Sequence, residues 1–190
     1  MTTQVSTRDL MVTGAAQLLS RAGLAEASFG NVLALTGAPR GSIYHHFPDG
    51  KDEMVSAAMR WLGGRLVEAL RQTPIDGPED VVVAFAGLFR RLLTDSGTQA
   101  GCAVAAVASS ADAGTAAARA AAAVFAAWES ELHTLFTASG LSPVRSSALA
   151  VTTLAVVEGA IVLARARGSL EPFDTAVHEL LQLTSGPAVR

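Results

Sequence analysis

Four polar side chains in one short segment are of the types that bind nucleic acids: Arg40, Ser42, Tyr44 and His45. They offer a guanidinium, a hydroxyl, a phenol and an imidazole, which hydrogen-bond base edges and phosphate oxygens. Ile43 and Phe47 are four residues apart, so on a helix they share one face and can enter a core. The polar side chains then point outward, and Gly41 would let the helix start approach a DNA backbone closely. We therefore expect this segment to be a helix that contacts DNA.

Catalytic and metal chemistry have weaker support in the sequence. His45 and His46 are adjacent, so on a helix they point about 100° apart and cannot easily share one metal ion. Cys102 could act as a nucleophile only if the distant His133 met it, and a lone cysteine among alanines and valines is more often a small buried hydrophobe. Paired carboxylates, a glycine-rich phosphate loop and a nucleophile elbow are not recognised. We expect no catalytic residue, no metal, no cofactor and no enzymatic activity.

Helix signals before and after this segment predict a helix-turn-helix. Ser6 can cap a first helix that stops near Gly23, and Ser28 can cap a second, shorter helix. Gly37 ends the second helix, and Pro39 suits the opening of the third because its missing N–H is not needed there. Such a motif places its second helix in the major groove of DNA. A fourth helix is expected from Lys51 to about Thr73, after the turn at residues 47–50.

Beyond the Pro-rich break at residues 74–78, further helix signals recur and strand signals do not. The apolar spacing predicts five more helices, at about 79–95, 102–111, 113–138, 143–167 and 172–184. The fold class is therefore all-α, with about nine helices. A DNA-binding head at residues 1–50 is expected to precede a ligand-binding and dimerisation body at residues 51–190. The alanine-rich stretch at 116–127 is explained most simply by helices that approach closely.

Charge and cysteine content limit the possible functions. The 190 residues carry a formal net charge of −3, which argues against a protein that coats nucleic acid through bulk basicity. Residues 1–60 hold five basic and five acidic side chains, so the negative charge lies entirely in the rest of the chain. A neutral head must bind DNA through a few placed contacts and through dimerisation. A single cysteine excludes an internal disulfide and a four-cysteine zinc site, and it suggests the reducing cytoplasm.

The segment from Ser146 to Ala164 is long and apolar enough to span a bilayer. A carboxylate near its centre, that of Glu158, would be costly in hydrocarbon. We therefore expect a buried helix and no membrane association. Because few polar positions remain for a solvated face, the helices near 143–167 and 172–184 are expected to form a homodimer interface; packing within one subunit is the alternative.

The sequence from Gly37 to Phe47, followed by Lys51, resembles the signature of the TetR family of bacterial transcriptional regulators. The resemblance covers residues 6–60 closely, and the rest of the chain in architecture and length. Residues 101–104 and 158–160 resemble the LmrA/YxaF-like branch. Alanine stands at position 27, where many members carry threonine, so one phosphate contact could be missing.

The resemblance implies a dimeric repressor that binds a near-palindromic operator on double-stranded DNA and is released by an apolar or aromatic small molecule. It implies that the last two helices of each subunit form a four-helix bundle. Arg40 and Ser42 would contact base edges, and Tyr44 and Lys51 would contact phosphates. The full set of implied DNA contacts is Ser28, Arg40, Gly41, Ser42, Tyr44, His45 and Lys51.

Large aromatic rings in the body could pack in its core or line an apolar ligand pocket. We expect ligand contacts from Trp61, Phe89, Trp128 and Glu158. Glu158 could instead pair with an arginine such as Arg90 or Arg119, or lie at an interface. Two other functions stay open. One is a helical small-molecule-binding or enzymatic protein with a purely structural head, and the other is a DNA-binding protein whose body only dimerises.

Overall fold

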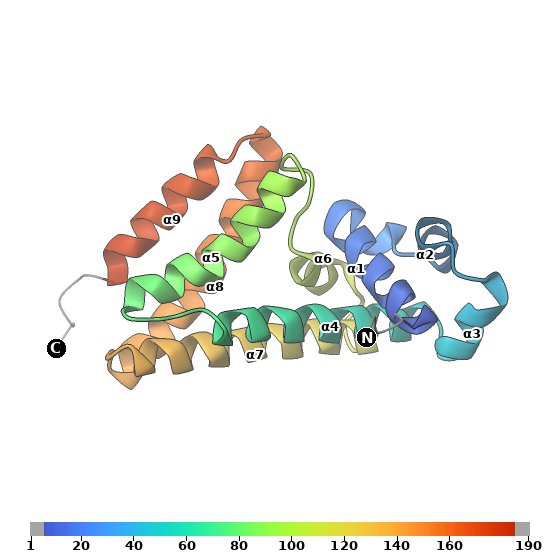
Figure 1. Ribbon diagram of the computed structural model, residues 1–190, viewed down its shortest axis with the longest axis horizontal. Coiled ribbons are helices and arrows are strands. Elements are labelled where there is room, and N and C mark those ends of the chain that lie inside the picture. The colour runs from blue at the N-terminus through green and yellow to red at the C-terminus, as the bar shows by residue number, and fades with distance from the viewer. Residues whose placement is uncertain (1–5, 185–190) are drawn as a thin grey trace, which may run out of the picture. The chain divides into compact units, whose positions relative to one another are not determined.

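The computed structural model describes residues 6–184, and within them it contains nine α-helices, one 3₁₀ turn and no strand (Figure 1). The all-α prediction is confirmed. The chain divides into two compact units. The first unit joins the residues up to Gly64 with Cys102–Phe125, and the second joins Arg65–Gly101 with the residues from Ala126 onward. These units follow packing, whereas the predicted division into 1–50 and 51–190 follows function and stays a prediction.

The first unit begins with the two helices whose caps the sequence predicts. Helix α1 (Thr7–Glu26) starts at Ser6, whose side chain accepts a hydrogen bond from the Asp9 amide. The helical path is interrupted at Gly23, which adopts a φ of 79°. Helix α2 (Phe29–Thr36) starts at Ser28 in the same manner and ends at the left-handed Gly37. The sequence predicts these helix ends correctly because each capping residue satisfies backbone groups within its own turn of helix.

The third helix is shorter than the sequence predicts. Pro39 is extended and lies just before a 3₁₀ turn, η1 (Arg40–Ser42), which leads into α3 (Ile43–His46). Both the amide and the hydroxyl of Ser42 donate to the Pro39 carbonyl, which closes a three-residue turn in place of an α-helical one. Pro48 then disfavours helical geometry at the residue before it, Phe47.

Helix α6 (Ala103–Ser110) and the first part of α7 (Ala116–Ala138) complete the first unit, where α6 packs against α1. The start predicted for α7 at residue 113 is wrong, because Gly114 adopts a left-handed φ of 82°. Helix α4 (Lys51–Arg71) approaches α7 closely: a Cβ at Gly63 would lie 2.8 Å from a methyl of Val124. Ala117, Ala120 and Ala121 are buried, as expected of an alanine-rich helix that a neighbour approaches closely.

The second unit is built around α5 (Pro78–Asp95), α8 (Pro143–Arg167) and α9 (Glu171–Thr184), which pack against one another (Figure 1). Arg90 on α5 binds both carboxylate oxygens of Asp174 on α9 at 2.8 and 2.9 Å. These hydrogen bonds and the guanidinium charge hold the pKa of the Asp174 carboxyl below its usual value. The partner of Arg90 is therefore Asp174, not the Glu158 that the sequence suggested.

Helix α8 has one buried face and one exposed apolar face. The buried face includes Leu149, Val157 and Ile161. The exposed face carries seven apolar or small residues at spacings of three and four, the α8 stripe: Val144, Ala148, Val151, Ala155, Gly159, Val162 and Ala166. By length and composition, α8 is the one helix in residues 6–184 that could cross a membrane, and 39% of its most apolar stretch is buried in the protein.

Candidate nucleic-acid interface

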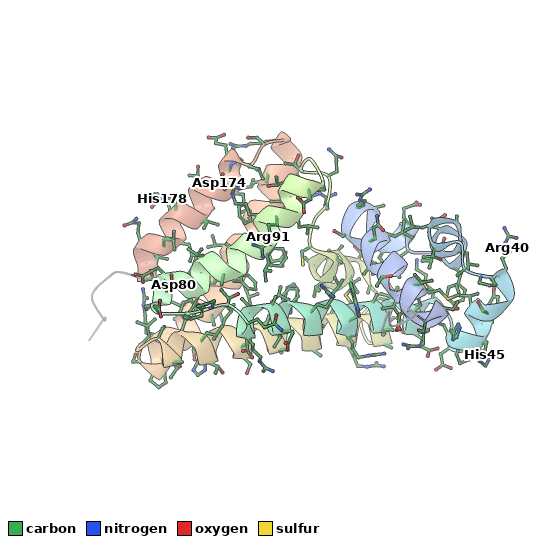
Figure 2. The ribbon with its side chains drawn as sticks, in the orientation of Figure 1. Arg40, His45, Asp80, Arg91, Asp174 and His178 are labelled. Carbon is green, nitrogen blue, oxygen red and sulfur yellow. The ribbon has the colours of Figure 1, made fainter. Side chains whose placement is uncertain are left out.

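The α2–α3 segment separates buried from exposed side chains as the sequence predicts. Ile43 and Phe47 are 1% and 0% exposed, whereas Tyr44 between them is 69% exposed. Arg40 and His45 are also exposed, and Figure 2 shows both side chains projecting away from the helices that carry them. The recognition segment, residues 40–47, thus has an apolar base and a polar outer surface.

Aromatic contacts hold the recognition segment on α2. The ring of Phe29, the first residue of α2, lies 5.4 Å from the ring of Tyr44 in an edge-to-face arrangement and 6.5 Å from the ring of Phe47. The Arg8 guanidinium lies 5.2 Å from the centre of the Phe47 ring. Such pairs favour one ring orientation. Tyr44 is therefore supported on one side while most of its side chain stays open to solvent.

The two serines predicted to contact DNA already take part in local hydrogen bonds. The Ser42 hydroxyl donates to the Pro39 carbonyl at 2.7 Å, so its lone pairs remain available to accept a hydrogen bond. The Ser28 hydroxyl accepts from the Asn31 amide at 3.2 Å, so its own proton remains available for a phosphate oxygen. In this arrangement Ser42 suits a base amino group and Ser28 suits a phosphate.

Gly41 has no conformational or packing reason to be glycine within the chain. Its φ is not positive, and a Cβ at this position would meet no atom within 4 Å. Gly41 is also exposed, next to Arg40. A missing side chain here leaves room for a molecule outside the chain, which agrees with a close approach to a DNA backbone.

Lys51 has a role inside the protein that the sequence did not suggest. Its Nζ donates to the carbonyl of Leu24 at 2.6 Å and lies 3.4 Å from that of Ala25, near the end of α1. A cation stabilises the negative end of a helix, and carbonyls in its last turn lack helical partners. The lysine sits at the start of α4, as predicted, but its charge also fastens α4 to α1.

The residues predicted to contact a ligand are divided between the two units. Phe89 and Trp128 come together in the second unit with ring centres 6.0 Å apart, and Phe85 joins them at 5.3 Å from Phe89 and 6.3 Å from Trp128. All three rings are buried. Glu158 lies on α8 in this unit with its Oε1 atom buried, and Trp61 belongs to the first unit.

Comparison with known proteins agrees with this geometry. Residues 12–58 match the family model of bacterial regulatory proteins of the tetR family, and residues 78–179 match the C-terminal domain of LmrA/YxaF-like transcriptional regulators. The chain is therefore a transcriptional regulator. The chain belongs to the TetR family and carries a C-terminal domain of the LmrA/YxaF-like type.

Relatives and solved structures cover nearly the whole chain. The chain is 34% identical over 182 residues to the HTH-type transcriptional regulator Rv0196 of Mycobacterium tuberculosis, covering 93% of each chain. It is 26% identical to YxaF of Bacillus subtilis, covering 86% of this chain and 87% of YxaF. In fold it is similar to TetR regulators from Legionella pneumophila (TM-score 0.81, 20% identity, covering 97% of this chain and 100% of that one) and Rhodobacter sphaeroides (TM-score 0.79, 19% identity, covering 93% and 98%). Regulators of this family bind DNA as dimers.

Proposed function

We propose that this protein is a repressor that binds a near-palindromic operator as a homodimer in the cytoplasm and has no enzymatic activity. The recognition segment carries the proposal, because exposed Tyr44, Arg40 and His45 project from a base fixed by buried Ile43 and Phe47. Arg40 and Ser42 contact base edges, whereas Tyr44, Ser28 and Lys51 contact phosphates. His45 and the open backbone at Gly41 complete the contact surface.

Substitutions in this surface distinguish base contacts from phosphate contacts. We expect Tyr44→Phe and Lys51→Ala to weaken binding to all duplexes, since phosphates carry no sequence information. Lys51→Ala should also reduce the salt dependence of binding by about one ion per contact. Arg40→Ala should cost about 1–3 kcal/mol per half-site and relax sequence preference.

Fluorescence anisotropy on a selected operator and on a scrambled duplex measures these effects. Wild-type affinity in all three variants would show that the recognition segment is assigned wrongly. A purely structural head, the competing hypothesis, requires that the wild-type protein bind no duplex with saturation.

The α8 stripe is the surface that we propose for dimerisation. Val144, Val151 and Val162 are at least half exposed although they are large and apolar, and they recur on one helix face. Small residues between them, such as Ala155 and Gly159, allow a second helix to approach closely. A second copy of the chain fits this surface, and α9 contributes the exposed Leu183 to the same dimer.

The second unit supplies the proposed site for an apolar or aromatic effector. Phe85, Phe89 and Trp128 form a buried cluster of rings. The hydroxyl of Thr153, on the buried face of α8, is buried and makes no hydrogen bond to the described residues. Apolar pockets commonly combine aromatic walls with one or two polar groups. Glu158 remains a proposed ligand contact in this unit. The ligand contact expected of Trp61 stays a prediction of its own, because Trp61 belongs to the first unit.

A thermal-shift screen with aromatic compounds tests the effector. A compound at a hundred times its Kd should stabilise the protein by about 2.7 kcal/mol, which raises the Tm by several degrees. Phe89→Leu should reduce this shift while the protein still binds its operator, and the same compound should release wild-type protein from DNA. A compound that raises the Tm but leaves DNA binding unchanged would contradict its role as an inducer. The absence of any stabilising compound would favour a body that only dimerises.

A further inference from the structure

Three consecutive charged residues at the start of α4 each bind a different segment of the first unit. Lys51 donates to the Leu24 carbonyl near the end of α1, as described above. Glu53 accepts a hydrogen bond at 3.0 Å from the amide of Asp49, in the turn that follows α3. Asp52, between them, binds the first turn of α7. The first turn of α4 therefore binds the end of α1 and the start of α7, which are distant in sequence, as well as the turn directly before it.

The contact made by Asp52 is a helix cap from a distant part of the chain. The amides of Ala116 and Ala117, the first two residues of α7, donate to the Oδ2 and Oδ1 atoms of Asp52 at 2.8 and 2.9 Å. The amide of Ala118 donates instead to the hydroxyl of Thr115, the residue before the helix, at 3.1 Å. The start of α7 thus has a local cap and a remote cap, and of these two caps the remote one alone joins α7 to α4.

A second contact fixes the same pair of helices further along. As noted for the fold, Gly63 on α4 lies against Val124 on α7. Between the recognition segment and Asp52 there are only the turn residues and Lys51, and the Gly50 amide donates to the Phe47 carbonyl across this turn. Few residues therefore separate the first turn of α7 from the surface proposed to read DNA.

We propose that Asp52 is a positioning residue for DNA recognition. Its carboxylate holds the first turn of α4 against the first turn of α7, so the pose of the recognition segment follows the position of α7. This inference rests on the proposed DNA-binding function and adds a residue that touches no DNA. Operator affinity then depends on the α4–α7 link and not only on the contact surface.

The direction of the change in operator affinity distinguishes a positioning role of Asp52 from a purely electrostatic one. Loss of a carboxylate close to a DNA-binding surface should strengthen DNA binding if only long-range electrostatics mattered. The positioning role requires the opposite for Asp52→Asn, a weaker and less specific complex with the operator. Asp49→Asn is the charge-matched control, because Asp49 is exposed and only three residues away. Thr115→Ala is the cap-matched control, because it removes the local cap of α7 and leaves the link to α4 intact.

The test uses the full chain and, as probe, the duplex that the wild-type protein selects from a random-sequence library. We expect Asp52→Asn to lower affinity for this duplex about tenfold, a typical magnitude for coupling between two sites. Affinity for a scrambled duplex should stay the same or rise. Thr115→Ala and Asp49→Asn should change operator affinity less than about threefold. Asparagine keeps one acceptor oxygen, so Asp52→Asn loses one of the two hydrogen bonds to α7, whereas Asp52→Ala loses both. Hydrogen exchange at Ala116 and Ala117 should accelerate in Asp52→Asn and more in Asp52→Ala, which reports that the link is weakened in a folded protein.

Two results would overturn the proposal while leaving the DNA-binding function intact. Faster exchange at Ala116 and Ala117 with wild-type operator affinity would show that the link has no effect on recognition. An equal loss of affinity in Thr115→Ala and Asp52→Asn would show that fraying of α7, and not its link to α4, is responsible. A wild-type protein that selects no duplex would refute the DNA-binding function and this inference together.

Discussion

Arginine in place of Gly159 is expected to convert the protein to a monomer and to lower its affinity for the operator at least a hundredfold. Gly159 lies within the α8 stripe, between Ala155 and Val162, and is exposed in a single chain. In the proposed interface a guanidinium at this position would be buried against the partner's stripe, where it loses solvent and meets only apolar or small side chains. Two heads on one dimer raise each other's effective concentration on the operator, a gain of about 10²–10⁴ that a monomer lacks.

The substitution should not lower the folding stability of the protomer. A Cβ at Gly159 meets no atom within 4 Å, and replacing glycine in a helix by arginine improves helix propensity by roughly 1 kcal/mol. Gly64→Arg is a matched control, since Gly64 is also an exposed helical glycine with open space around it. It adds the same positive charge to the chain, on α4 and outside the stripe.

Light scattering after size-exclusion chromatography gives the oligomeric state, and anisotropy gives operator affinity. Gly64→Arg should stay dimeric and bind as tightly as wild type. If the Gly159→Arg protein remains dimeric, the α8 stripe is not part of the dimer interface. Monomers that bind the operator as tightly as wild type would show instead that dimerisation is not needed for affinity.

The parts of the fold that the sequence predicts are those with local causes. The caps at Ser6 and Ser28 and the stop at Gly37 each act within one turn of helix, so residue type and spacing suffice to place them. The opposite faces of Ile43 and Tyr44 follow from helical periodicity alone. In contrast, the shape of residues 39–42 depends on which donor reaches the Pro39 carbonyl, and periodicity does not decide that.

Contacts between residues far apart in the chain could not be predicted from the sequence. The acidic residues after Lys51 are readily interpreted as favourable charges at the start of a helix, an interpretation that applies to any helix start. That Asp52 caps α7 depends on where α7 begins, 64 residues later. Arg90 likewise finds its carboxylate 84 residues away, at Asp174 instead of Glu158. Such pairings follow from helix packing, which determines which charges come within reach.

Alanine in place of Phe47 is expected to abolish operator binding by loosening the recognition segment, although Phe47 is fully buried and faces away from the proposed DNA surface. Its ring contacts Phe29 and Arg8, and its amide and carbonyl close the end of α3 and the turn to α4. Truncating a buried phenylalanine costs about 3–5 kcal/mol, a large part of the roughly 5–15 kcal/mol that stabilises a typical domain. The dimer interface proposed in the second unit should survive.

Tyr44→Ala distinguishes the loss of core packing from the loss of a DNA contact, because it removes a neighbouring ring that is mostly exposed. It loses one edge-to-face pair with Phe29 and should cost only about 1 kcal/mol of stability, yet it should also weaken operator binding. Thermal unfolding and hydrogen exchange of residues 43–50 distinguish the two variants: exchange should accelerate strongly in Phe47→Ala and little in Tyr44→Ala. Equal stability of the two proteins would mean that Phe47 does not hold the segment. The recognition surface would then depend on contacts to α2 and α4 alone. In the anisotropy assay, tight operator binding by Phe47→Ala would likewise show that Phe47 is not needed to hold the segment.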